Sequence, residues 1–195
     1  MRTTLSRLGR AAVLLLPALA LAHTGEGAPH GHNAFLGGLL HPLTGTDHLA
    51  AMLALGVWSA LAVRPVWLAP AAFVLMLGAG AVAGLAGLAV PAVEPMIAVS
   101  LLVIGLLVVR RQQLPLALAA TLAGLFAFFH GVAHGTELAA SSPLPALGGM
   151  LTGTLLLHLA GMALGRHVLR RQRVLSAAAG GAVALLGSAL LLGLG

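Results

Sequence analysis

The feature that most limits what this chain can fold into is the near absence of charge between long apolar segments. Charged residues make up 7% of the 195 residues and hydrophobic residues 59%, whereas soluble domains are about 25% charged. This composition excludes a soluble globular domain and a disordered chain. The apolar segments are long and rich in Leu, Ala and Gly, and they do not alternate as barrel strands do. We therefore predict an all-α, polytopic membrane helical bundle.

The amino terminus has the three-part pattern of a secretory signal peptide. Its first ten residues carry three arginines, an apolar stretch follows, and Ala20–Ala22 supplies a small-x-small cleavage site. We predict a cleaved signal peptide over 1–22; an uncleaved signal anchor is the alternative. The mature chain then begins at His23, and residues 23–32 form an exposed His-rich tail.

The remainder, 33–195, is predicted to form one transmembrane domain of six helices, since a span needs about 20 apolar residues. The first span is interrupted by Pro42 and Gly45. Proline removes a backbone donor and disfavours helix at the residue before it, so this helix should be kinked or discontinuous at Pro42; a short re-entrant piece before the main helix is the alternative. The expected spans are 33–63, 66–88, 93–111, 115–138, 146–169 and 173–194.

The loops between these spans differ in charge. Arginines occupy the loops after the first, third and fifth spans, whereas the loops around Pro91 and Ser142 carry none. By the positive-inside rule the arginine loops are cytoplasmic. This predicts a multi-pass protein of the bacterial inner membrane, with the mature amino terminus and the carboxyl terminus on the periplasmic side. The basic charge thus reports topology, and no nucleic-acid partner is expected.

Ionisable side chains inside a membrane are costly and mark function by default. In the fourth predicted span, three such residues follow one another at i, i+4 and i+7, which places two imidazoles and a carboxylate on one helix face. This is a metal-ligand arrangement. The first and fifth spans carry further ionisable residues at comparable depth. The predicted metal-binding residues are His41, Asp47, His48, His130, His134 and Glu137, with His158 in the fifth span as a weaker candidate.

Charge balance agrees with a metal site. Asp47 and Glu137 together neutralise one divalent ion, and neutral imidazoles complete its shell. Histidines bonded to backbone carbonyls in the core are the alternative. His23 can add a free amine and an imidazole, or lie in a merely solvated tail. Met52 can add a sulfur, although packing is its commoner role, and Glu94 either caps the third span or serves metal entry.

Two segments resemble a known family. HPLTGTDHLAAM (41–52) is similar to the His-x₅-Asp-His signature of the HupE/UreJ family of nickel/cobalt permeases, and FHGVAHGTE (129–137) resembles its second motif. The resemblance covers essentially the whole chain. It implies a secondary transporter (permease) that takes up Ni²⁺ or Co²⁺ for enzymes such as hydrogenase or urease. It also implies functional roles for the six residues of the two motifs; His158 is added from its position alone.

The predicted function is therefore metal-ion transport across the lipid bilayer, not enzymatic catalysis, with no prosthetic group. The chain has no lysine and no phosphate-binding loop, which argues against ATP as the driving force. Imidazole and carboxylate ligands suit nickel, cobalt, zinc and copper alike. A membrane metalloenzyme or a haem-binding protein that uses the same histidines is the alternative. The oligomeric state is left open, a homo-oligomer included.

Overall fold

The computed structural model describes residues 31–138 and 143–194. Three expectations lie outside the described residues: the signal peptide over 1–22, the metal-binding role of His23, and the loop around Ser142. The expected tail over 23–32 also lies outside them, except for its last two residues, with which the first helix begins.

The described residues form helices and no β-strand. Five of their seven α-helices, α3 to α7, are long and apolar enough to cross a membrane, and α1 and α2 are shorter apolar helices. A helix satisfies its own backbone polar groups, as a lipid environment requires. The prediction of an all-helical, multi-pass membrane protein is thus confirmed. The elements are α1 (Gly31–Thr44), α2 (Thr46–Ala62), α3 (Leu68–Leu85), α4 (Val93–Arg110), α5 (Leu116–Leu138), α6 (Pro143–His167), a 3₁₀ turn (Leu169–Arg171) and α7 (Arg173–Leu191).

The segment predicted as the first span forms two helices, α1 and α2. Pro42 lies inside α1, and the interruption falls three residues later at Gly45, whose backbone is extended with φ −91° and ψ 123°. The Thr44 hydroxyl donates a hydrogen bond of 2.7 Å to the carbonyl of His41, which occupies an acceptor at the end of α1. The position of the break therefore differs from the predicted one at Pro42, because the helix continues for two residues beyond the proline.

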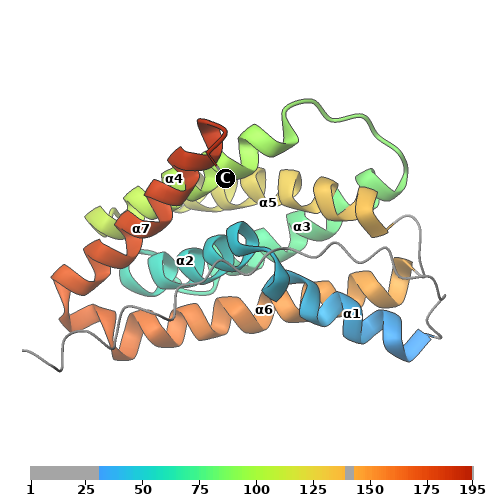
Figure 1. Ribbon diagram of the computed structural model, residues 1–195. Coiled ribbons are helices and arrows are strands. Elements are labelled where there is room, and N and C mark those ends of the chain that lie inside the picture. Colours follow the sequence, from blue (N-terminus) through green and yellow to red (C-terminus); the bar gives the residue numbers. More distant parts are fainter. Residues whose placement is uncertain (1–30, 139–142, 195) are drawn as a thin grey trace, which may run out of the picture.

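Helices α1 and α2 follow one another along α6 (Figure 1). Both contacts are made at glycines of α6. A Cβ atom on Gly149 would lie 2.0 Å from the carbonyl oxygen of Phe35 in α1, and one on Gly161 would lie 2.3 Å from that of Leu53 in α2. Small residues permit such close approach of helix backbones. The short helices together thus pack along a single long helix.

Helix α5 packs closely against α3 through the glycines that follow its two histidines. A Cβ on Gly131 would lie 2.1 Å from the carbonyl oxygen of Leu77, and one on Gly135 would lie 2.2 Å from that of Ala81. The space beside the histidine pair is therefore taken by another helix. With this face of α5 fixed against α3, the neighbouring face presents His130 and His134 to α1 and α2.

The helix ends divide the bundle into two chemically distinct ends. The last turn of α5 and the first turns of α2 and α4 carry the three carboxylates of the described residues, Asp47, Glu94 and Glu137. Arginines follow the opposite ends of these helices, at the end of α4 and in the connection from α6 to α7. Since α2 and α4 have 17 and 18 residues, the two ends lie about 25 Å apart.

Candidate functional site

The helix break and the end of α5 bring the two sequence motifs together. His41 lies in the last turn of α1, whereas Asp47 and His48 lie in the first turn of α2. Gly45 between them leaves room for this pair, because a Cβ there would lie 3.1 Å from both the Asp47 carboxylate and Nδ1 of His48. The break thus allows residues seven positions apart to face one site from two helices.

Three side chains from α1 and α5 converge on one point. Nε2 of His41 lies 2.9 Å from Nδ1 of His134 and 3.1 Å from Oε2 of Glu137, and Nδ1 of His134 lies 3.5 Å from the same carboxylate oxygen. A proton on Nε2 of His41 can be shared by the other two atoms as acceptors. The three atoms therefore form a compact triangle of nitrogen and oxygen donors.

The size of this triangle suits a transition-metal ion. Nitrogen and oxygen ligands bind such an ion at about 2.0–2.2 Å, so two ligands of one ion lie about 2.9–3.5 Å apart in octahedral or tetrahedral geometry. The three measured separations fall within this range. An ion can therefore replace the shared proton of His41, His134 and Glu137 with little movement of the side chains.

His48 is oriented by its sequence neighbour. Its Nδ1 lies 3.1 Å from Oδ1 of Asp47, so the imidazole donates from Nδ1, and its Nε2 has no hydrogen-bond partner among the described residues. Metal-binding histidines commonly have the other ring nitrogen held in this way by a carboxylate or a carbonyl. The His48 ring lies 4.3 Å from that of His134 and 5.1 Å from that of His130. His48 therefore connects two groups of side chains, the exposed group of His41, His134 and Glu137 and the buried group that begins at His130.

His130 shows the same arrangement one turn deeper in α5. Its Nδ1 donates to the carbonyl of Phe126 at 2.9 Å. Its Nε2 is buried and has no hydrogen-bond partner among the residues that the structure describes. An unpaired buried nitrogen is costly, and an occupying cation would remove that cost. The histidine bonded to a carbonyl and the metal ligand are therefore compatible interpretations of this residue, one for each ring nitrogen.

His158 lies apart from this group. The Phe73 ring contacts both, with its centroid 5.6 Å from that of the His130 ring and 5.1 Å from that of the His158 ring. Both ring nitrogens of His158, and the hydroxyl of Thr154 one turn earlier in α6, are buried without a hydrogen-bond partner in the described ranges. They form a second, deeper polar position, separated from the first by one aromatic ring.

A pocket of about 280 Å³ opens onto the exposed part of the site. All three described carboxylates line it, namely Asp47, Glu94 and Glu137, together with His41 and His48. Glu94 lies in the first turn of α4, where a carboxylate also stabilises the helix. Both predicted roles of Glu94, at a helix start and at a metal entry, therefore fit its position.

The side chains of the site form a graded series from surface to interior. Glu137 and His41 are 59% and 35% exposed, whereas His134 is 2% exposed and His130 and His158 are completely buried. Neighbouring members of the series are linked by a hydrogen bond, an ion pair or a contact between rings. Met52, by contrast, belongs to the apolar core around Trp58 and Phe73, which favours packing as its role.

The sequence did not single out two components of this arrangement. Phe73 in α3 gave no signal, because an aromatic residue in an apolar span is ordinarily core. Thr154 also went unnoticed; its spacing of four residues from His158 was the available clue, since residues i and i+4 share a helix face.

The fold and the donor set define the class of the molecule, a polytopic helical membrane protein with histidine and carboxylate donors gathered between its helices. The chain belongs to the HupE/UreJ family, whose model, described as HupE / UreJ protein, matches residues 11–190. It is also similar to Protein HupE of Rhizobium leguminosarum bv. viciae, with 42% identity over 185 residues that cover 93% of this chain and 95% of that protein. No solved structure gave a significant match. The family resemblance inferred from the two motifs is thereby confirmed.

Proposed function

We propose that the protein is a secondary transporter that takes up a divalent transition metal, with Ni²⁺ as its principal substrate, for supply to metalloenzymes such as hydrogenase or urease. Membership of the HupE/UreJ family supports a role in metal transport. Co²⁺ is the second candidate substrate, since imidazole and carboxylate ligands suit both ions. The ion is cargo, and the proposal includes no prosthetic group and no catalytic step.

The observation that carries this proposal is the graded series of donors. An ion first meets the exposed Glu137 and His41, then His134, which is shared between the exposed and the buried groups. From there the free Nε2 atoms of His48 and His130 lead inward. A resident structural metal would have one closed shell of ligands. Donors that continue from surface to interior suit an ion that moves.

The second position, His158 with Thr154, is proposed as the next stop on the path. Both carry buried polar atoms without a partner among the described residues, and the Phe73 ring separates them from His130. We propose that movement of this ring lets the ion pass. The cost of the unpaired atoms is then offset during transport, when the ion visits them.

The membrane potential suffices to drive uptake. Moving one charge through 100 mV yields about 2.3 kcal/mol, so a divalent ion gains about 4.6 kcal/mol, which corresponds to more than three decades of accumulation. Asp47 and Glu137 line the same pocket and are proposed to neutralise the ion while it is bound, because a bare divalent ion in a poorly solvated place is costly.

The alternative of a haem protein or a membrane metalloenzyme fits less well. The pocket beside the histidines has a volume of about 280 Å³, at or below the lower limit of about 300 Å³ for sites that bind small organic ligands. It suits an ion with its water better than a haem.

We further propose that the protein is non-enzymatic and lies in the inner membrane, with six spans, a cleaved signal peptide and periplasmic termini.

The test is uptake into proteoliposomes under an imposed membrane potential, with the lumen of the liposome negative. Ni²⁺, Co²⁺, Zn²⁺ and Cu²⁺ are compared for the unaltered protein, with empty liposomes and the Glu137→Gln variant as controls. We expect potential-dependent accumulation of Ni²⁺ that Glu137→Gln abolishes at low metal concentration. Accumulation no greater than in empty liposomes for all four ions would contradict the proposal, as would a visible haem spectrum of the purified protein.

A further inference from the structure

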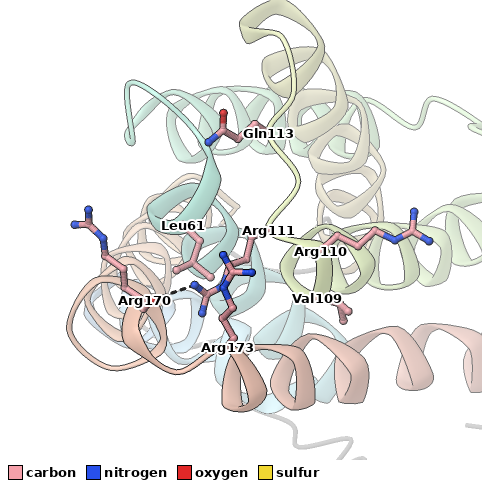
Figure 2. A pocket seen from close by; sticks show the side chains of 7 residues that line it. All are labelled: Leu61, Val109, Arg110, Arg111, Gln113, Arg170 and Arg173. Carbon is pink, nitrogen blue, oxygen red and sulfur yellow. Dashed lines mark hydrogen bonds between the residues drawn. The ribbon is translucent and has the colours of Figure 1, made fainter.

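The end of the bundle opposite the metal site carries a second pocket, of about 430 Å³, lined mainly by arginines (Figure 2). Arg110 and Arg111 come from the end of α4, and Arg170 and Arg173 from the connection between α6 and α7. In Figure 2 the guanidinium groups of Arg111 and Arg173 lie centrally, and those of Arg110 and Arg170 extend to either side.

One of these arginines holds the pocket together. Arg111 adopts a left-handed conformation with φ 49° at the end of α4. Its guanidinium donates to the carbonyls of Leu169 and Arg170 at 2.5 and 3.0 Å, and to the hydroxyl of Ser176 at 2.9 and 3.1 Å. These bonds attach α4 to the start of α7. Arg111 therefore serves the architecture of the pocket.

The other three arginines are available for a ligand. Arg110, Arg170 and Arg173 are exposed, and their guanidinium groups make no hydrogen bond or ion pair with any residue that the structure describes. All three described carboxylates line the metal pocket at the other end of the bundle. Topology requires positive charge at this end of the membrane, but it does not require four arginines around one cavity. Because no described carboxylate lies at this end to balance them, an external anion is the expected counter-charge.

An apolar pocket of about 200 Å³ lies between α2, α4, α6 and α7, and its lining reaches the ends of α4 and α6 that the arginines follow. Its lining includes Val108, two residues before Arg110, and Ala179, six residues after Arg173. Leu169 has contacts on both sides: its carbonyl accepts from Arg111, which lines the arginine pocket, and its buried side chain lines the apolar pocket. A free anion would not occupy the apolar pocket, whereas an acyl chain can fill it.

We propose that the arginine pocket binds the phosphate head group of an anionic phospholipid, with an acyl chain in the adjoining apolar pocket. Basic pockets between transmembrane helices are suited to such head groups, and guanidinium groups bind phosphate in pairs of hydrogen bonds. Val174, beside Arg173, is 85% exposed and offers apolar surface for the remainder of the lipid. The lipid joins α4 to α7 at the end opposite the metal pocket.

The test is lipid binding to the full chain in neutral detergent, followed by native mass spectrometry. Dioleoylphosphatidylglycerol is compared with dioleoylphosphatidylcholine, which has the same acyl chains. The variant Arg110→Gln/Arg173→Gln leaves Arg111 in place. The matched control, Arg64→Gln/Arg166→Gln, removes the same charge from exposed arginines outside the pocket at the same end of the bundle.

We expect the anionic lipid to bind more tightly than the zwitterionic one. Arg110→Gln/Arg173→Gln should weaken it about thirtyfold, as expected for two charges at a lipid surface, and the control less than about threefold. An equal loss in the control, or equal binding of both lipids, would overturn the proposal. So would displacement of the lipid by millimolar inorganic phosphate or glycerol 1-phosphate, which would indicate a site for a free anion. Thermal unfolding in the same detergent verifies that the variants are folded.

Discussion

At the scale of single residues, each motif holds one imidazole so that a single nitrogen stays free. Asp47 accepts from Nδ1 of His48, and the Phe126 carbonyl accepts from Nδ1 of His130. A fixed tautomer keeps the lone pair of Nε2 available to an ion, and the ring is already oriented before the ion binds. Asp47 thus has two tasks in the proposed transporter, to orient a ligand and to supply negative charge.

The first prediction concerns the two carboxylates of the motifs. Asp47→Asn or Glu137→Gln leaves a net positive complex in a poorly solvated place, and each change should cost about 3 kcal/mol or more of metal binding. Ni²⁺ uptake at low concentration should therefore fall by at least about 10²-fold. If both carboxylates serve one ion, the double variant should lose less than the sum of the two single losses.

Radioactive Ni²⁺ uptake, normalised to the amount of protein in the membrane, measures these losses. Thr136→Ala serves as the control on α5, because its exposed hydroxyl bonds only to the carbonyl of Ala133. Fully additive losses would show that Asp47 and Glu137 act on separate ions. Normal uptake in either single variant would remove that carboxylate from the site.

A second prediction separates the deeper position from the first. His158→Ala removes an imidazole that has no partner within the described ranges and lies beyond the Phe73 ring. The equilibrium affinity for Ni²⁺ at the exposed group of His41, His134 and Glu137 should change by less than about threefold. The uptake rate should fall by at least about tenfold, which corresponds to ~1.4 kcal/mol in the free-energy barrier. Isothermal titration and initial rates of uptake give the two quantities. A rate equal to that of the unaltered protein would take His158 off the path.

That the motif residues lie close together could be predicted from the sequence, because ionisable groups in apolar segments are rare and helical spacing places them on one face. Their division into a compact group and a buried group could not. It depends on which ring nitrogen is held, as with the Phe126 carbonyl that holds His130, and on the Phe73 ring contributed by another helix. Such contacts follow from packing between helices, which the spacing along one helix does not encode.

At the scale of elements, the site depends on how closely α5 packs against α3. Gly131 and Gly135 follow the two histidines directly, and their bare backbones touch α3. Membrane helices lack a hydrophobic driving force toward one another and associate through close packing and hydrogen bonds. The glycines therefore fix the rotation of α5 and, with it, the direction of His130 and His134.

This packing gives a third prediction. Gly131→Ala places a Cβ 2.1 Å from the carbonyl oxygen of Leu77 and 2.8 Å from a backbone nitrogen, so the two helices must move apart. We expect a loss of about 1–3 kcal/mol in the free energy of unfolding. Gly181→Ala is the matched control, since a Cβ there meets nothing within 4 Å and alanine favours a helix.

Thermal unfolding in detergent, followed by circular dichroism, compares the two alanine variants. Gly131→Ala should unfold at a lower temperature than the unaltered protein, and Gly181→Ala at the same or a higher temperature. Equal unfolding temperatures for the two variants would show that α3 and α5 can move apart at little cost in stability, despite the short distances between them.

The helical class and the approximate bounds of the five long helices, α3 to α7, followed from apolar length alone, because a bilayer leaves a chain few other solutions. The helix break was placed at Pro42, and the structure has it at Gly45. A proline inside a helix loses one hydrogen bond, a cost that neighbouring helices can compensate in a membrane. The local rule therefore indicated an interruption in this segment, but the contact of α1 with α6 decides how far the helix continues.

At the scale of the whole molecule, charge is separated along the bundle. The described carboxylates gather at one end and the pocket arginines at the other. From this separation the positive-inside rule predicts an orientation with the metal pocket toward the periplasm and the arginines toward the cytoplasm. In that orientation a membrane potential that is negative inside draws a divalent cation from the pocket toward the interior.

The last prediction tests this orientation. The sequence has no cysteine, so a single introduced thiol is unambiguous. Ala89→Cys lies in the exposed turn between α3 and α4, on the side of the metal pocket, and Gln172→Cys lies in the exposed connection to α7 beside the arginines. With intact cells whose outer membrane is permeabilised, a membrane-impermeant maleimide should label Ala89→Cys and leave Gln172→Cys unlabelled until the inner membrane is opened. Labelling of Gln172→Cys alone would place the metal pocket in the cytoplasm, and the same donors would then serve export, with the membrane potential opposing the movement of the ion.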